Sequence, residues 1–272
     1  TTWVAATQDR PTSWSYADPA THATSFSYQA RVVDVAGNVG STDSQAVTID
    51  TAAPTAAVDI TAIVDDTGAS SSDFITNDTS LTVSGTNGAL GAGEKVQVSS
   101  DGGNTWVDVS QGSGSWSYLD PASHTASFTY QVRVVDTAGN VGNTASQAVT
   151  IDTAAPTAVA TVMALSLDSG TAGDFITNVA SQTVSGTFTG TLGAGEKIQV
   201  SADGSTWIDA TAGAGTFSAA GVTLTAGGTT LSVRTIDTAG NTTAGTGHSF
   251  TLDTAAPAAT ATVTAISVDS GT

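Results

Sequence analysis

The sequence predicts an all-β protein made of tandem β-sandwich domains in a linear array, and three observations support this prediction. Apolar and polar residues alternate with a period of two in short stretches such as "SLTVSGT", "EKVQVSS" and "FTYQVRVVD". Turns rich in Gly, Asn, Asp and Ser separate these stretches about every 8–12 residues. The same motifs then return about 100 residues later, which is the mark of a repeat protein.

The repeat is marked most clearly by an aspartate before Thr-Ala-Ala-Pro. "IDTAAP" stands at Ile49–Pro54 and Ile151–Pro156, and "LDTAAP" stands at Leu252–Pro257. The 29-residue segments that begin at Tyr28 and Tyr130 differ at only four positions. We therefore divide the chain into the C-terminal part of one repeat, two complete repeats and the start of another, and expect a fragment of a longer array. These units one to four cover residues 1–50, 51–152, 153–253 and 254–272.

Each complete unit is expected to be an immunoglobulin-like sandwich of about seven strands. Seven short strands in about 100 residues are typical of that fold, and the absence of Cys excludes its disulfide-bridged form. In unit two we expect strands A to G at about 55–64, 81–85, 95–99, 106–109, 115–118, 128–136 and 145–151.

Composition excludes several classes of function. The chain has 272 residues, 24 acidic and only 6 basic, and its formal net charge of −18 argues against binding nucleic acid or anionic lipid. No stretch is apolar for the roughly 18 residues that a membrane span needs, so no membrane insertion is expected. Glu94 and Glu196 are the only glutamates. The preference for Asp suits turns and loops that wrap a hard cation.

Several recurring side chains are expected to have structural roles. We expect Trp3, Trp106 and Trp207, which share one register, to belong to the core. The strand F arginines should lie on the sheet face or form local ion pairs, and the three histidines should be ordinary loop or strand residues. These residues are Arg31, Arg133, Arg234, His22, His124 and His248.

The acidic loops point to a metal site between consecutive units. In a sandwich of this type, the A–B loop lies at the pole from which the chain leaves, and the B–C and F–G loops lie at the opposite pole. Between units two and three, oxygens should therefore converge from the A–B loop of unit two, from the linker, and from the B–C and F–G loops of unit three. The residues expected there are Asp66, Asp73, Asp152, Glu196, Asp237 and Asn241.

The same logic applies to the neighbouring seams. Asp50 and Asp253 occupy the linker position, and Glu94, Asp136 and Asn140 lie on the pole of unit two that faces unit one. Crowded carboxylates repel one another, and a bound Ca²⁺, which takes 6–8 oxygen ligands in irregular loops, would relieve that repulsion. Ca²⁺ is therefore the predicted cofactor.

Turn chemistry is the alternative explanation for these aspartates. Asp-x-x-Gly-Asn also makes a good hairpin turn, and an Asp before Thr can close an Asx turn. Asp101 and Asp203 are expected to act only in hairpin turns. Asp65 and Asp78 are left out of the site because unit three has Leu167 and Val179 instead.

At "DTGASSSDFITND", "GEKVQVSSDGGNTW", "VRVVDTAGNVG" and "IDTAAP" the sequence resembles the bacterial immunoglobulin-like repeats of giant type I-secreted surface adhesins, of the biofilm-associated and RTX-adhesin kind. The resemblance covers nearly every unit. It implies a cell-surface stalk whose consecutive modules are made rigid by Ca²⁺. It also adds Asp168 and Asp174 of unit three as the counterparts of Asp66 and Asp73.

The leading functional hypothesis is an extracellular structural extender that holds a distal adhesive domain away from a bacterial cell. Its partners would be neighbouring repeats of the same chain and, through the distal domain, a host or surface receptor. Two alternatives remain open: a module that itself binds glycan or protein, and a surface-layer or filament subunit. We do not expect an enzyme, because no Gly-x-Ser-x-Gly elbow, phosphate-binding loop or His-Glu-x-x-His helix is present.

Overall fold

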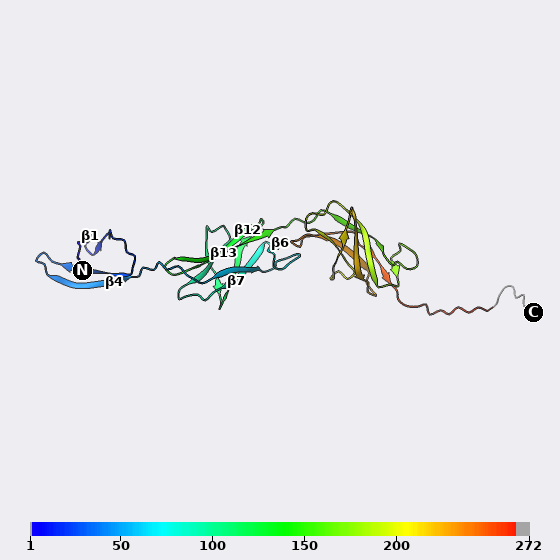
Figure 1. Ribbon diagram of the computed structural model, residues 1–272, viewed down its shortest axis with the longest axis horizontal. Helices are drawn as coiled ribbons and strands as arrows, with labels where there is room; N and C mark the ends of the chain where they lie inside the picture. The colour runs from blue at the N-terminus through cyan, green and yellow to red at the C-terminus, as the bar shows by residue number, and fades with distance from the viewer. Residues whose placement is uncertain (1, 265–272) are drawn as a thin grey trace, which may run out of the picture.

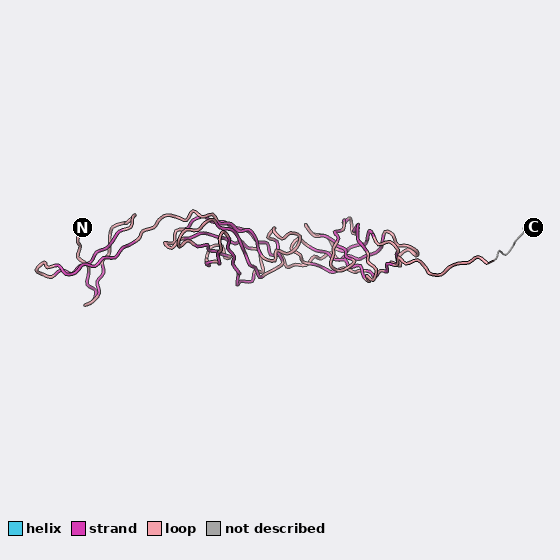
Figure 2. Tube along the Cα trace, turned by 90° about the horizontal axis from the view of Figure 1, so that it is seen from below, coloured by secondary structure: helices cyan, strands magenta, loops and turns pink. Residues whose placement is uncertain are grey.

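The computed structural model describes residues 2–264, and the regular structure in this range consists of strands. The units follow one another along the long axis of the molecule, from the N-terminal hairpins to the C-terminal segment (Figures 1 and 2). No helix in the described range has the length and apolar character needed to cross a membrane.

Unit two is a sandwich of two sheets. The first sheet has the order β10-β11-β7-β5 and is formed by β5 (Val58–Ile63), β7 (Ser80–Asn87), β10 (Ser110–Gln111) and β11 (Ser115–Ser123). The second has the order β6-β13-β12-β8-β9 and is formed by β6 (Ile75–Thr76), β8 (Lys95–Ser99), β9 (Val107–Asp108), β12 (Phe128–Val135) and β13 (Val141–Ile151). This confirms the all-β sandwich that the alternation predicts.

Unit three repeats this arrangement. Its first sheet, β14-β16-β20-β19, is formed by β14 (Val159–Leu165), β16 (Ser181–Thr189), β19 (Thr211–Ala212) and β20 (Thr216–Thr223). The second, β18-β17-β21-β22, is formed by β17 (Lys197–Ser201), β18 (Ile208–Asp209), β21 (Thr230–Ile236) and β22 (Thr242–Ala244). Three short strands complete the unit: β15 (Ile176–Thr177) pairs with β24 (Thr251–Leu252), and β23 (His248–Ser249) pairs with β21.

Unit one contains two hairpins. The first is β1 (Thr7–Arg10) with β2 (Ser13–Ser15), and the second is β3 (Phe26–Val33) with β4 (Val39–Val47). In the second hairpin Tyr28 lies opposite Gln45, and in unit two Tyr130 lies opposite Gln147 in the same register. Near-identical sequences therefore give the same strand pair in both units.

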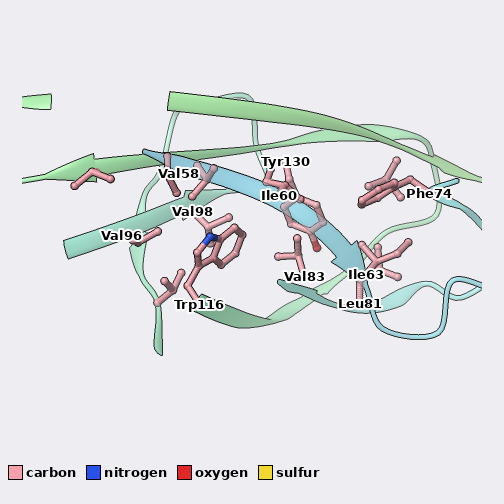
Figure 3. Packing of buried hydrophobic residues seen from close by; sticks show 14 of the residues in the cluster. Val58, Ile60, Ile63, Phe74, Leu81, Val83, Val96, Val98, Trp116 and Tyr130 are labelled. Atoms are coloured by element: carbon pink, nitrogen blue, oxygen red, sulfur yellow. The ribbon is translucent and has the colours of Figure 1, made fainter. Parts of the chain in front are cut away.

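The core of unit two follows from the period of two. On β7 the side chains of Leu81 and Val83 are fully buried, and on β12 those of Tyr130, Val132 and Val134 are fully buried, while the residues between them face outward. Figure 3 shows side chains from both sheets meeting in one layer around Trp116 and Tyr130. Unit three has its own separate core cluster. Each complete unit thus buries an apolar interior of its own.

Trp116 packs flat against a glycine on the neighbouring strand. A Cβ atom on Gly85 would lie 2.6 Å from Trp116 Cζ2 and 1.9 Å from the carbonyl oxygen of Asp59. The Trp116 indole N–H also donates to that same Asp59 carbonyl, at 3.1 Å. In unit three, Gly186 lies in the same way under Phe217. The glycine is therefore required by the close approach of a ring and a backbone.

Several features of the strands differ from the sequence prediction. Strand G begins at Val141 rather than near residue 145, and strand E continues to Ser123. In addition, β6 and β15 were not predicted: each is a two-residue strand that pairs in parallel with the last strand of its unit. Such short segments carry no visible alternation, and their partners lie far along the chain.

We expect Gly85→Ala to destabilise unit two by about 1–3 kcal/mol, the usual cost of overpacking a core. Gly112→Ala is the matched control, since a Cβ there would lie 3.5 Å from its nearest neighbour, Ser115 Oγ, an ordinary contact. Thermal unfolding of both variants and the parent measures the effect. Equal midpoints for Gly85→Ala and Gly112→Ala would show that the packing of Trp116 on Gly85 is not tight.

Candidate functional site

The acidic A–B loop of unit two, which connects β5 to β7, is anchored at its end by Phe74. This side chain is buried in the core although its backbone has a positive φ of 60°. Ile75 and Thr76 then pair with Thr150 and Ile151 at the end of β13. Because β13 runs directly into the linker, the loop and the linker are fixed to each other at this pole.

Asp66 in this loop has one carboxylate oxygen without a partner. Its Oδ2 accepts a hydrogen bond from the Phe74 N–H at 3.0 Å, whereas its Oδ1 is buried and has no partner among the described residues. Asp168 of unit three repeats this: Oδ2 accepts from the Gly173 N–H at 2.7 Å, and Oδ1 is buried and unpartnered. Burying an ionised oxygen without a partner is costly, and a bound cation would remove that cost. Each of the two loops therefore leaves one buried carboxylate oxygen open to a further partner.

The linker aspartates each close an Asx turn. Asp152 Oδ1 accepts the N–H of Ala154 at 3.0 Å, and Asp50 and Asp253 do the same with Ala52 and Ala255. The Asp152 backbone N–H donates to the Thr76 carbonyl oxygen at 3.0 Å. These turns fix the direction of the linker as it leaves β13.

The F–G loop of unit three, between β21 and β22, is hydrogen-bonded to the linker through Asn241. The Asn241 side-chain amide donates to the Asp152 carbonyl oxygen at 2.8 Å and to Asp237 Oδ2 at 2.9 Å. At the preceding seam, Asn140 makes the same two contacts, to the Asp50 carbonyl oxygen at 3.1 Å and to Asp136 Oδ2 at 2.8 Å. Asn140 and Asn241 therefore tie each linker to the unit that follows it.

The carboxylates of Asp136 and Asp237 serve their own turns. Asp136 Oδ1 accepts the backbone N–H groups of Ala138 and Asn140, both at 2.9 Å, and Asp237 Oδ1 accepts the Asn241 N–H at 2.9 Å. Hydrogen bonds from the Asn140 side chain and backbone hold the pKa of Asp136 below its usual value. These residues stabilise the loop that carries Asn140 or Asn241.

Four other predicted ligands also accept backbone N–H groups nearby. Glu94 and Glu196 accept the N–H of Gly91 and Gly193 within the B–C turns. Asp73 and Asp174 accept the N–H of Ile75 and Ile176 at the ends of the A–B loops.

The structure brings the A–B loop of unit two against the F–G loop of unit three, as the sandwich topology predicts. The Thr67 hydroxyl donates to the Ala239 carbonyl oxygen at 2.7 Å, and the Ala69 N–H donates to the Thr238 carbonyl oxygen at 3.1 Å. We call this contact region the seam.

The seam does not gather the predicted carboxylates into one cluster. Across residues 2–264 there is no group of three or more His, Cys, Asp or Glu side chains that could hold a metal ion. A groove of about 290 Å³ lies beside the seam, but Lys197 and Arg234 line it together with Asp209 and Asp237. Cationic side chains make this groove a poor place for Ca²⁺. The calcium ligand set stays a prediction, with Asp66 as the residue whose geometry favours it most.

Sequence comparison identifies the repeated unit. One family model, described as a bacterial Ig-like domain, matches residues 53–153 and again residues 155–254. The chain belongs to the bacterial Ig-like domain family. A second model with the same description matches residues 3–51, so unit one is an Ig-like segment too. Comparison with curated proteins gives no match.

Solved structures with similarity to these Ig-like domains include one of a bacterial adhesin, one of a biofilm-associated protein and one of titin. The first comes from work on host cell surface retention of a 1.5-MDa bacterial ice-binding adhesin. It has 25% identity and a TM-score of 0.36, and the match covers 84% of this chain and 74% of that one. The BSP domain of a biofilm-associated protein has 16% identity and a TM-score of 0.26, over 74% and 30%. A set of titin domains has 13% identity and a TM-score of 0.35, over 82% and 71%. The family assignment rests on the sequence models alone.

The expectation that the recurring tryptophans belong to the core of the Ig-like domains is wrong. The guanidinium of Arg133 lies 4.0 Å from the ring centroid of Trp106, and Arg31 with Trp3 and Arg234 with Trp207 make the same contact. Arg133 also donates from Nε and Nη2 to Gln97 Oε1, at 3.0 and 2.9 Å. These are cation–π pairs outside the hydrophobic core. The joint recurrence of Trp and Arg in units one, two and three is the sequence signal that could have revealed them.

A second group that sequence reasoning missed is a buried polar network in unit two. Asp120 Oδ2 accepts from the Tyr130 hydroxyl and contacts His124 Nε2, both at 2.9 Å, while Oδ1 accepts the Ala122 N–H. The His124 ring stacks on Phe128 with centroids 3.7 Å apart. Burial raises the pKa of Asp120, but the hydrogen bonds from Ala122, His124 and Tyr130 outweigh it and leave that pKa lowered. His124 is thus part of the packing and not an ordinary loop residue.

We expect Asp120→Asn to destabilise unit two at neutral pH by about 1–3 kcal/mol, the cost of leaving buried hydrogen-bonding groups poorly paired. Because the folded pKa of Asp120 is lowered from 3.8, the parent keeps this contribution above pH 4 and loses it as the pH falls further. Urea unfolding followed by NMR signals of each unit, at several pH values, measures the difference.

Unit three is the internal control for this experiment, since Gly221 stands at the position of Asp120 in the aligned repeats. Its stability should not change with the Asp120 substitution. An unchanged acid profile for unit two in Asp120→Asn would contradict the role of this network.

Proposed function

We propose that the chain is a non-catalytic structural extender of a large bacterial cell-surface adhesin. The observation that carries this proposal is the direct contact between successive Ig-like units. The linker at Asp152 is bonded to unit two through the Thr76 carbonyl and to unit three through the Asn241 side chain. A linker held from both sides transmits the orientation of one unit to the next, which is what a stalk requires.

We further propose that Ca²⁺ stiffens each seam. The unpartnered buried oxygens of Asp66 and Asp168, at the same place in two repeats, support this. When bound, Ca²⁺ would supply positive charge to 6–8 oxygen ligands. Asp66 would hold it first, with Asp73, Asp152 and Asp237 from the set that the sequence predicts. Asp168, Asp174 and Asp253 would do so at the following seam.

The charge of the chain gives this proposal a physical basis. With a net charge of −18, consecutive units repel one another, and two like charges about 4 Å apart repel by about 1 kcal/mol in water. Neutralising acidic groups at each seam would therefore favour the docked arrangement. Extracellular modules bind Ca²⁺ with Kd of about 10⁻⁴–10⁻³ M, so stiffening would follow export to a calcium-containing exterior.

Location and partners belong to the same proposal. An extender of this kind would be exported by type I secretion and would stand on the outside of a bacterial cell. Its partners would be the neighbouring Ig-like repeats, and a distal domain would contact the host or surface receptor.

Small-angle X-ray scattering with Ca²⁺ and with chelator tests the calcium proposal. We expect the parent chain to give a stiffer, more extended profile in millimolar Ca²⁺ than in chelator. Asp66→Asn should lose most of this response, because it removes the charge of the proposed ligand in the A–B loop that contacts unit three.

Asp168→Asn is the matched control, since it removes the same acid from the A–B loop of unit three and should leave the seam between units two and three responsive. Identical parent profiles in Ca²⁺ and in chelator would refute the calcium proposal. Titration calorimetry of the same variants would separate loss of binding from loss of stiffening.

A further inference from the structure

The two loops at the seam touch backbone to backbone, with glycines at the point of contact. Gly68 of unit two has a φ of +96°, and Gly240 of unit three has a φ of +94°. Both values lie in the left-handed region that favours glycine. The hydrogen bonds from Thr67 to Ala239 and from Ala69 to Thr238 lie on either side of Gly68. The contact therefore uses main-chain groups and the Thr67 hydroxyl, none of which carries a net charge.

Space at this contact excludes any side chain. A Cβ on Gly68 would lie 2.1 Å from the Thr238 carbonyl oxygen and 2.7 Å from the Ala239 carbonyl carbon. A Cβ on Gly240 would lie 2.9 Å from the Gly68 nitrogen. The neighbouring atoms belong to the backbone, which cannot rotate away as a side chain can. Glycine is thus needed for both shape and conformation.

The glycine conformations recur at the equivalent positions where, within residues 2–264, no other group lies against the glycine. Gly170, the counterpart of Gly68 in unit three, has a φ of +87°, and Gly139, the counterpart of Gly240 in unit two, has a φ of +90°. A Cβ on either would meet nothing within 4 Å. The positive φ of these glycines therefore does not depend on contact with a neighbouring unit.

Local hydrogen bonds explain how the A–B loop is preformed. In unit two the Asn77 N–H donates to Thr67 Oγ1 at 2.9 Å, and in unit three the Asn178 N–H donates to Ser169 Oγ at 2.9 Å. Both hydroxyl groups are fixed from inside their own loop. Thr67 in addition reaches across the seam to Ala239.

We propose that these loops form a backbone clasp between consecutive repeats. One half is Thr/Ser-Gly in the A–B loop, and the other half is Ala-Gly in the Asp-x-Ala-Gly-Asn F–G loop of the next repeat. Ser169–Gly170 is then a docking surface for the F–G loop of the repeat that follows unit three. The clasp orients neighbouring units through neutral main-chain and hydroxyl groups, and it acts in addition to any bound Ca²⁺.

Spin-label distance measurements test the clasp directly. The chain has no Cys, so Ser117→Cys in β11 and Ser218→Cys in β20, both exposed, place one label on each side of the seam. The parent should give a single narrow distance distribution. Gly68→Ala should lose that narrow peak, because the added Cβ cannot fit between the loops.

Gly170→Ala is the matched control. It places Ala at an equivalent positive φ, so it carries similar local strain, but it does not lie in the seam between units two and three. It should therefore keep the narrow peak of the parent. A narrow, unshifted peak in Gly68→Ala would overturn the clasp.

A second pair of variants keeps the clasp testable if Gly68→Ala fails to fold. Gly240→Ala approaches the clasp from the other loop, with Gly139→Ala as its control at the same φ and in open space. Loss of the peak in Gly240→Ala but not in Gly139→Ala supports the clasp, and no difference between them refutes it.

Measuring each variant in Ca²⁺ and in chelator separates this inference from the calcium proposal. A parent peak that is equally narrow in both conditions counts against calcium stiffening, yet leaves the clasp supported if Gly68→Ala loses the peak. A Gly68→Ala variant that stays narrow in Ca²⁺ counts against the clasp alone.

Discussion

The pairing of two residues, Ile75 and Thr76, with the end of β13 is the constraint on which the seam depends. It comes directly after Phe74, whose ring is buried in the core and whose strained backbone turns the chain out of the acidic loop. The Thr76 hydroxyl donates to the Asp65 carbonyl oxygen at 3.0 Å, so the start of the same loop is bonded here as well. Core, A–B loop and last strand are thereby joined within a few residues.

This joint explains why a loop without regular structure can position a neighbouring domain. The linker leaves β13 next to the fixed loop and is turned by Asp152, so both reach unit three from one rigid base. Unit three contacts the linker through its F–G loop, in which Asp237 orients the Asn241 side chain toward the Asp152 carbonyl oxygen. The aspartates at the linker and in the F–G loop thus each have a place in this chain of contacts, whether or not they also bind a cation.

The sequence predicted the strands well because alternation is a local property that each strand carries by itself. It also placed the A–B and F–G loops at facing poles, since sandwich topology fixes where they lie. It could not show β6, which is too short to alternate, nor the partners of each carboxylate, which depend on atomic positions in the turns. Trp106 was assigned to the core because a period of two does not show which face of a sheet packs against the other sheet. In the structure the Arg133 guanidinium covers the Trp106 ring, and this pair lies outside the core.

The central claim is that consecutive Ig-like units are held in one orientation by the seam. Residual dipolar couplings of backbone amides in units two and three, measured on the intact chain in millimolar Ca²⁺, test it most directly. We expect both units to fit a single alignment tensor in the relative orientation seen in the structure. Two tensors of different magnitude, one for each unit, would show independent tumbling and would contradict the account.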